Sequence, residues 1–355
     1  MSVIHFAEKF KQALLKGFCK ASETDALFSH DLDMEFSGVK TVHVTSLKTE
    51  KMQDYDRSKN VGTGSRYGDT KEVGDEVQTF TMTQDKSLSL SIDKGNNAEQ
   101  FNVKKAGAVM KAHRDEQIIP EVDKYRLGKW AKDAGIHKEL AAKTDKSNIV
   151  SQIIDLHNEM LDAGVPDQIT LVITRSYLPA LKLSTEWTAL DSLGGKTLPK
   201  GTIGEFDGMP VKPMTSKKMP ANVPFMLLFK GSVIAPMKIN DFKGHVDPPG
   251  LSGDLLEFRM MHDAFVLGKK ANGVAVGCLP GTVTATPTIA VAEGKATITC
   301  AGATIYYTTD GSDPRYSVEA KAYTAAVEVK SGDQVRAYAV KNGLFNSAVA
   351  ESDIA

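Results

Sequence analysis

The stretch from Asn97 to Ala134 constrains the fold of this chain more than any other, because it is the longest segment with a helical pattern. Its apolar residues recur roughly on one face of a helix, whereas lysines, arginines and carboxylates occupy the other faces. The apolar face consists of Phe101, Val109, Met110, Ile118, Val122, Tyr125 and Trp130. We therefore predict a long, half-buried helix on which other segments pack.

Pro120 lies inside this helical pattern. Proline has no amide hydrogen, and its ring clashes with the preceding turn of a helix. The sequence therefore predicts a kink or a break near Ile119.

Length and composition set the class of protein. The chain has 355 residues, of which 41% are hydrophobic and 25% charged, as in a soluble globular protein of two or three domains. It has no run of 18 apolar residues, and its N-terminus lacks a signal-peptide core, so we expect an intracellular protein without a membrane partner. The three cysteines show no metal or redox spacing, which favours a reducing compartment.

The segments before the long helix predict an arm and a projecting hairpin. Residues 3–20 have the pattern of a short amphipathic helix, which needs a surface to lie on. Residues 38–47 predict a strand, and residues 48–74 are charged, rich in glycine and poor in aliphatic side chains. Two further strands, Glu76–Gln84 and Lys86–Asp93, follow. The hairpin is useful only if a partner surface packs on it.

The segments after the long helix predict a compact α+β subdomain. Its expected elements are a helix at Ser147–Gly164, a buried strand at Gln168–Thr174, a short helix at Arg175–Leu183, a hairpin turning at Asp207-Gly208, and strands at Val223–Phe229 and Val233–Pro236. We read Asn240–Gly253 as a linker. The strands Leu255–Val266 and Gly273–Gly277 are expected to return to the layer of the long helix.

No segment has the pattern of a catalytic, metal or nucleotide site. The glycines at 62–68 and at 194–195 lack the spacing of nucleotide-binding loops. The eight histidines are scattered, and His262 and Asp263 are neighbours in a strand pattern, so their side chains point apart. We predict a protein that is not an enzyme and has no cofactor.

Several local patterns occur in the order found in one known family. They are Tyr55-Asp56-Arg57 in the charged hairpin, Ile118-Ile119-Pro120-Glu121-Val122-Asp123 with Tyr125 in the helix, Phe206–Val211, Ala235-Pro236, and Met261–Val266 with Lys269-Lys270. In this order, which spans about residues 35–278, the chain resembles the major capsid proteins of tailed bacteriophages. No single motif is specific to the family, but the order of all of them is.

The resemblance implies an α+β capsid-protein fold and a division of the chain. The expected parts are an N-terminal arm at 1–37, an extended loop hairpin at 38–96, the spine helix of a peripheral domain at 97–146, an axial domain at 147–253 and return strands of the peripheral domain at 254–279. The apolar face of the helix should be covered by the strands at Val77–Ile92 and Leu255–Gly277, and by the arm or a neighbour's loop.

The resemblance also implies a function and a set of residues. The chain is expected to self-assemble into homo-hexamers and homo-pentamers of an icosahedral virion capsid that encloses double-stranded DNA, with a portal protein as partner and assembly in the bacterial cytoplasm. Inter-subunit contacts are expected from the extended loop at Tyr55, Asp56, Arg57, Arg66 and Tyr67. The spine helix is represented by Phe101, Pro120, Glu121, Tyr125 and Trp130.

Three details of that function concern the scaffolding protein, the DNA and covalent cross-links. About 37 residues precede the first strand, too few for a large helical scaffolding extension, so a separate scaffolding protein is our hypothesis. Residues 97–146 hold eleven Lys and Arg against eight Asp and Glu, which suits contacts with DNA phosphates. An ordinary solvated helix face explains that excess equally well. No residue match supports the covalent cross-links found in some shells of the family.

The last 74 residues have a different pattern, with short β-rich runs separated by turn signals and no helical periodicity. This is typical of a β-sandwich. The segment Thr304–Pro314 is similar to the immunoglobulin-like module of chitobiase-type glycosidases, so we predict an immunoglobulin-like decoration domain at 280–355, displayed outside the shell. Its candidate glycan contacts are Tyr306, Tyr307 and Asp310. The alternative function is a secreted or surface carbohydrate-binding protein that uses this domain.

Overall fold

The computed structural model describes residues 22–29, 35–37, 40–47, 52, 54–59, 65–67, 72, 75–99, 106–141, 144–184, 188–189, 202–292, 294–317, 319–330 and 333–352. The chain forms two compact units, a loop unit at residues 31–83 and a main unit that comprises the rest. The predicted helix at 3–20 and the predicted spine residue Phe101 lie outside the described residues.

The long predicted helix is present in the main unit, and it contains one π-helical turn. After α2 (Lys94–Glu99), the chain forms α3 (Ala106–His113), the π turn η2 (Arg114–Ile118) and α4 (Ile119–Lys132). The amide of Ile119 donates to the carbonyl of Arg114, five residues earlier. Pro120 follows in the first turn of α4. The disturbance predicted near Ile119 is therefore confirmed in position, but the wider turn lets the helix continue. We call residues 106–132 the spine helix.

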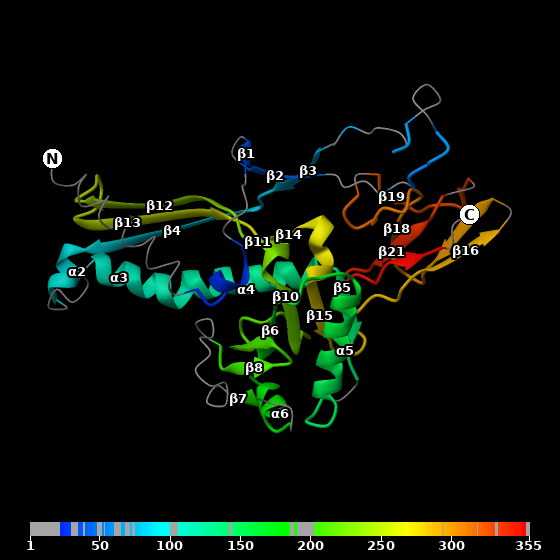
Figure 1. Cartoon of the computed structure of the whole chain (residues 1–355). Helices are drawn as coiled ribbons and strands as arrows, with labels where there is room; N and C mark the ends of the chain where they lie inside the picture. The colour runs from blue at the N-terminus through cyan, green and yellow to red at the C-terminus, as the bar shows by residue number, and fades with distance from the viewer. Residues whose placement is uncertain are drawn as a thin grey trace. The chain divides into compact units, whose positions relative to one another are not determined.

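A three-stranded antiparallel sheet covers the first half of the spine helix (Figure 1). Its order is β12 (Met237–Val246), β13 (Gly253–His262) and β4 (Gln84–Asp93). Leu88, Leu90 and Ile92 of β4 pack toward the helix, whereas the serines between them are exposed. The predicted cover by the chain's own strands is thus confirmed for β4 and β13.

The linker predicted at Asn240–Gly253 is wrong over its first half. Residues 237–246 form β12, which pairs with β13 from Met237 to Val246. Only Phe242 of this strand is fully buried, so its apolar alternation is too weak to reveal a strand. The true turn lies at 247–252, where Asp247 and Gly250 have φ values of 49° and 85°.

A mixed seven-stranded sheet forms the centre of the main unit. Its order is β5 (Ile136–Glu139), β15 (Val274–Cys278), β10 (Phe225–Phe229), β6 (Ile169–Thr174), β9 (Met209–Met214), β8 (Gly204–Phe206) and β7 (Thr188–Ala189). One face packs on the second half of α4, and the other packs on α5 (Ile149–Asp162). In β10, Met226 and Leu228 face α4, whereas Phe225 and Leu227 face α5.

Most of the predicted elements of this region are present, including α5, β6, β10 and α6 (Leu178–Lys182). The hairpin turns at Asp207-Gly208, where both residues have positive φ. The predicted strand Val233–Pro236 is reduced to β11 (Val233–Ile234), which pairs with β14 (Phe265–Val266). The strand expected at Gly273–Gly277 is β15, which joins the seven-stranded sheet and not the β4–β13 sheet, although it packs on α4. The parallel strand β5 was not predicted.

The loop unit contains an antiparallel sheet of β1 (Glu35–Ser37), β2 (Thr41–Leu47) and β3 (Asp75–Thr81). The last pair of the β2–β3 ladder is Leu47 with Asp75, so residues 48–74 form the connection of this hairpin. The predicted pair of strands around a polar excursion is confirmed.

The C-terminal residues form a β-sandwich, as predicted. One sheet contains β16 (Thr288–Ala292), β17 (Lys295–Thr299) and β20 (Val327–Glu328). The other contains β19 (Lys321–Ala322), β18 (Thr304–Thr308), β21 (Arg336–Val340) and β22 (Ala350–Glu351). We call β16–β22 the C-terminal sandwich. Its core is small, being formed by Ala296, Ile298, Ile305, Val329, Val335, Ala337 and Ala339.

Candidate functional sites on the spine helix and the extended loop

The spine helix holds a fully buried carboxylate, Asp123. Ser22 and Thr24 donate hydroxyl hydrogen bonds of 2.6 and 2.7 Å to its Oδ1, and the amide of Glu23 and Lys218 Nζ donate bonds of 3.2 and 3.0 Å to its Oδ2. Burial opposes ionisation, but the hydrogen bonds from Ser22, Thr24 and Lys218 outweigh it and hold the pKa of Asp123 below its usual value. Asp123 is therefore an ionised anchor for the chain segment at residues 22–24.

Arg126, one turn later, secures the next residues of the same segment. Its Nη1 donates to Thr24 Oγ1 at 3.0 Å and pairs with Asp25 Oδ1 at 3.6 Å. Its guanidinium lies 4.9 Å from the centre of the Phe28 ring, which in turn packs on Trp130 with a centroid distance of 6.2 Å. Residues 22–28 are thus fixed on α4 by hydrogen bonds, an ion pair and aromatic contacts.

Lys218 adds a third segment to this cluster. It lies in the turn after β9 and donates to Glu23 Oε2 at 2.9 Å as well as to Asp123. Burial works against the charge, but the hydrogen bonds to Glu23 and Asp123 raise the pKa of Lys218. We call Ser22, Glu23, Thr24, Asp25, Asp123, Arg126 and Lys218 the anchor cluster. Sequence reasoning missed it, because nothing local distinguishes these polar residues from surface ones.

The predicted spine residues have structural roles. Tyr125 Oη donates to Asp263 Oδ1 at 2.7 Å, and the Tyr125 ring meets the edge of His262 at 5.5 Å. Burial and the nearby charge of Arg126 lower the pKa of His262 to about 4. Trp130 is fully buried and donates to the carbonyl of Ile234 at 3.4 Å. Glu121 is exposed and pairs with Lys86 at 3.4 Å.

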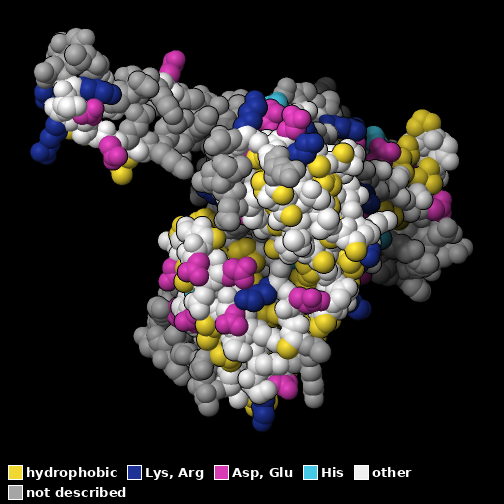
Figure 2. Space-filling view, turned by 90° about the vertical axis from the view of Figure 1, so that its right-hand side faces the viewer, with side chains coloured by type: hydrophobic (Ala, Val, Ile, Leu, Met, Phe, Trp, Pro, Cys, Tyr) yellow, Lys and Arg dark blue, Asp and Glu magenta, His cyan; other side chains and the backbone are white. Residues whose placement is uncertain are grey.

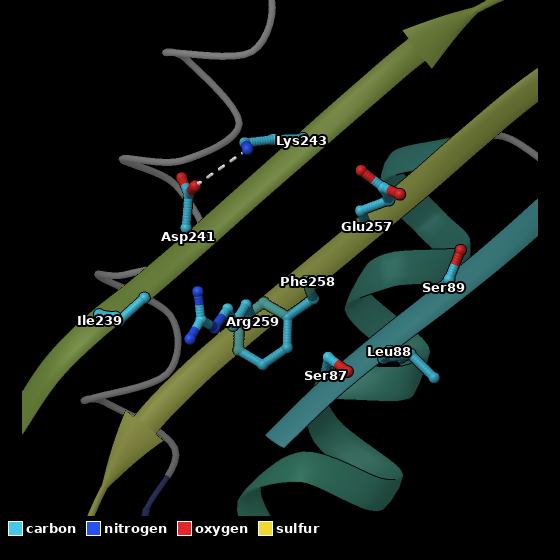
Figure 3. A pocket seen from close by; sticks show the side chains of 9 residues that line it. All are labelled: Ser87, Leu88, Ser89, Ile239, Asp241, Lys243, Glu257, Phe258 and Arg259. Carbon is cyan, nitrogen blue, oxygen red and sulfur yellow. Dashed lines mark ion pairs between the residues drawn. The ribbon is translucent and has the colours of Figure 1, made fainter. Parts of the chain in front are cut away.

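The outer face of the β12–β13–β4 sheet carries a hollow of about 460 Å³ (Figure 3). Side chains of all three strands line it, with Asp241 and Lys243 of β12 at 3.8 Å from one another. Arg259 of β13 also holds Asp85 of β4 through two hydrogen bonds of 3.0 and 2.7 Å. Charges of both signs therefore alternate across this face, so it can contact a polar surface of another protein.

The described residues of the extended loop bring together four of the five predicted contact residues. The Tyr55 and Tyr67 rings meet edge to face at 5.1 Å, and the amide of Asp56 donates to the carbonyl of Arg66 at 3.0 Å. Met52 is fully exposed, Tyr67 is 81% exposed and Tyr55 is 48% exposed. Arg57 is exposed beside them. The loop thus presents large apolar side chains on a closed turn.

The three candidate glycan contacts do not share one surface. Tyr306 stacks on Tyr338 of the neighbouring strand with a centroid distance of 5.6 Å. Tyr307 points to the opposite face, where it packs against Tyr323 at the core of the sandwich. Asp310 accepts hydrogen bonds from Ser312 within its own turn.

The described parts of the chain hold no group of three or more His, Cys, Asp or Glu side chains placed to bind a metal ion. None of the described helices is long and apolar enough to cross a membrane. On the face shown in Figure 2, acidic and basic side chains lie intermixed, with hydrophobic side chains scattered among them. This distribution accords with the formal net charge of −1.

Solved phage structures share the fold. The chain is similar to the capsid structure of the cyanophage P-SCSP1u, with a TM-score of 0.51 and 10% identity over 69% of this chain and 84% of that one. It is similar to a structure from Microbacterium phage Oxtober96, with a TM-score of 0.52 and 10% identity over 73% and 91% of the two chains. For Mycobacterium phage Bobi, the TM-score is 0.50 and the identity 12%, over 74% and 91%.

Residues 296–354 match the family described as Fn3 associated. No curated protein matches the chain. The expected architecture is confirmed: the chain has an α+β fold seen in a phage capsid, followed by an immunoglobulin-like β-sandwich.

Proposed function

We propose that this chain is a structural subunit of a virion shell, whose copies assemble into hexamers and pentamers of an icosahedral capsid around double-stranded DNA. The observation that carries the proposal is the extended loop, together with the fold. Met52, Tyr55 and Tyr67 are exposed in the described part of the hairpin connection at 48–74. A single exposed apolar residue is ordinary, but three on one long loop indicate a surface meant to be covered.

Copies of the same chain are the partners that fit this loop. Repeated contacts between different surfaces of identical subunits close into rings and shells, and they cover a projecting loop on every copy. The outer face of the β12–β13–β4 sheet offers a second surface, since its alternating charges favour a complementary polar neighbour over an apolar one. In this proposal the predicted axial domain (147–253) loses β12, which pairs with β13 on the sheet that covers the spine helix. Of the predicted return segment (254–279), β13 lies on that sheet, whereas β15 lies in the seven-stranded sheet.

The test is the size of the expressed full chain. Sedimentation and negative-stain microscopy are expected to show capsomers or closed particles at micromolar concentration. A chain that remains monomeric, both alone and when produced together with the other structural proteins of its source, would refute the proposal. Uniform closed shells formed by the chain alone would instead refute our hypothesis of a separate scaffolding protein, while supporting self-assembly.

The remaining partners follow from the same proposal. A shell of this kind needs a portal through which DNA enters, and it meets the DNA through contacts that do not depend on base sequence. Binding of the assembled particle interior to DNA should therefore weaken steeply with salt, whereas a sequence-specific complex would retain a preferred site at high salt.

Glycan binding by the C-terminal sandwich is a second candidate function, favoured by the stacked pair Tyr306 and Tyr338. Aromatic faces on a sheet provide amphipathic contact area for a ligand. A glycan array probed with the full chain and with the Tyr306→Ala variant tests it. Hits that the variant loses support binding at this pair, and an array without hits removes the candidate.

A further inference from the structure

The C-terminal end of the spine helix is contacted by side chains of the C-terminal sandwich. The last carbonyls of any helix lack partners within the helix and need donors from elsewhere. Tyr316 Oη donates to the carbonyl of Asp133 at 2.9 Å, and Arg315 Nη1 donates to the carbonyl of Gly135. His137 Nε2 donates to the carbonyl of Ala131 at 2.7 Å. Two of these three donors come from about 180 residues further along the chain.

Arg315 is held in place for this contact. Asp313 accepts hydrogen bonds from its Nε at 3.0 Å and from its Nη2 at 2.6 Å, which leaves Nη1 directed at Gly135. The Arg315 side chain is only 8% exposed, and its guanidinium lies 5.4 Å from the centre of the Tyr316 ring. A buried, pre-oriented cation at a helix C-terminus also opposes the negative end of the helix dipole.

Apolar contacts extend the same junction. The Phe345 ring stacks on His137 with a centroid distance of 5.3 Å and an interplanar angle of 26°. Val283, Tyr316 and Phe345 pack against the core cluster that contains Trp130. The sandwich therefore buries side chains on the same core that α4 shares with the central sheet.

The connection between β15 and the sandwich is also bonded on both sides. The amide of Leu279 donates to the carbonyl of Asn222 at 2.9 Å, and that of Gly281 donates to the carboxylate of Glu139. The amide of Phe345 donates to the carbonyl of Thr282 at 2.8 Å. Residues 279–284 thus have the bonding of a packed connection and not that of a free tether.

We propose that the C-terminal sandwich is a built-in clamp of the spine helix, which caps α4 through Tyr316 at Asp133, secures the residues that follow the helix through Arg315 at Gly135, and holds a fixed orientation on the subunit. The clamp does not depend on the proposed shell function, because all of its contacts lie within one chain. The clamp has two consequences. Destabilising the sandwich increases local unfolding at the end of α4, and the sandwich keeps one orientation relative to the rest of the subunit.

Hydrogen exchange of the full chain tests the clamp. Tyr316→Phe removes only the hydroxyl that donates to Asp133, and Arg315→Met removes the donor to Gly135 while keeping an unbranched, mostly apolar stem. Both variants are expected to exchange about tenfold faster at amides 131–137 and 279–284, while amides 149–162 of α5 keep their rates.

Tyr323→Phe is the matched control. Its hydroxyl accepts a hydrogen bond of 3.1 Å from the amide of Ile298 inside the sandwich, and it does not touch α4. This control should speed exchange within residues 296–299 and leave residues 131–137 unchanged. Native exchange at residues 131–137 in both Tyr316→Phe and Arg315→Met would overturn the clamp. If Arg315→Met fails to fold, native exchange at residues 131–137 in the Tyr316→Phe variant alone overturns the clamp, because this small change leaves the fold intact.

Discussion

At the scale of single residues, the main unit depends on charges that lie inside it. Asp123 is fully buried and receives four hydrogen bonds, two of them from the hydroxyls of Ser22 and Thr24. Arg126 is 2% exposed and Lys218 is partly buried beside it. Removing the buried carboxylate leaves its hydrogen-bond donors without an acceptor in a poorly solvated place, and it leaves Lys218 with Glu23 as its remaining carboxylate.

Asp123→Ala should therefore lower the free energy of unfolding by about 3–5 kcal/mol, because Ser22, Thr24 and Lys218 all lose the buried carboxylate to which they donate. Urea denaturation followed by circular dichroism measures the change. Asp241→Ala is the control, since Asp241 forms an exposed pair with Lys243, and its effect should stay within about 1 kcal/mol. Equal effects of the two substitutions would contradict an energetic role for the anchor cluster.

Two buried histidines should make the stability depend on pH. Burial lowers the pKa of His137 to about 4, helped by the charge of Arg315, and burial with the charge of Arg126 lowers that of His262 to about 4. In the unfolded chain both titrate near 6.5. The unfolded state thus binds more protons between these values, so stability is complete above about pH 6.5 and falls as the pH drops toward 4.

The slope should approach roughly 1.4 kcal/mol per pH unit for each histidine in that window. Urea midpoints at pH 7.5, 6.5, 5.5 and 4.5 measure it. The His137→Gln substitution should reduce the slope of stability against pH by the contribution of one histidine. A native chain with equal midpoints at pH 7.5 and 4.5 would rule out both shifts.

At the scale of elements, two glycines of the spine helix and its following turn differ in the space available for a side chain. Gly135 connects α4 to β5, and a Cβ there would lie 2.4–2.5 Å from backbone atoms of Ala271 and Asn272. Gly128 lies within α4, and a Cβ there would meet nothing within 4 Å. The same substitution should therefore have opposite effects at two positions seven residues apart.

Gly135→Ala should destabilise the chain by about 1–3 kcal/mol, because the opposing backbone cannot yield as a side chain can. Gly128→Ala should stabilise it by about 0.5–1 kcal/mol, since alanine favours a helix interior over glycine. Thermal unfolding of the two variants and of the native chain measures both changes in stability. A loss of stability in Gly128→Ala as large as that in Gly135→Ala would show that the close contact is not the cause.

At the scale of the whole molecule, assembly should depend on the extended loop without the fold depending on it. The double variant Tyr55→Ser/Tyr67→Ser removes two exposed rings that contact one another in the loop unit. Its unfolding midpoint should match that of the native chain, whereas sedimentation should show loss of the largest assemblies. Val291→Ser, on an exposed position of β16, should leave assembly unchanged. Normal particles from the double variant would place the inter-subunit contacts elsewhere.

The local pattern of the sequence determined a large part of the fold. The helical spacing from Val109 to Trp130, the disturbance before Pro120, the positive-φ turn at Asp207-Gly208 and the alternation in Lys86–Asp93 all follow from neighbouring residues. The order of these patterns indicated the capsid-protein fold, and the composition of the last 74 residues indicated the sandwich. The elements follow from backbone or burial preferences within about ten residues of chain, whereas the capsid-protein fold was implied by a resemblance in the order of motifs over about residues 35–278.

Only the tertiary structure decided the features that depend on contacts between residues far apart in the sequence. β12 is a strand because β13 pairs with it, and β5 because it pairs with β15, although neither has a strong pattern of its own. The candidate sites follow the same rule. Asp123 accepts a hydrogen bond from Ser22, 101 residues earlier in the sequence, and Arg315 donates one to Gly135, 180 residues earlier. A polar residue has the same local pattern whether water or a distant segment satisfies it. The sequence therefore determined the elements, and the packing of distant segments determined the anchor cluster and the clamp.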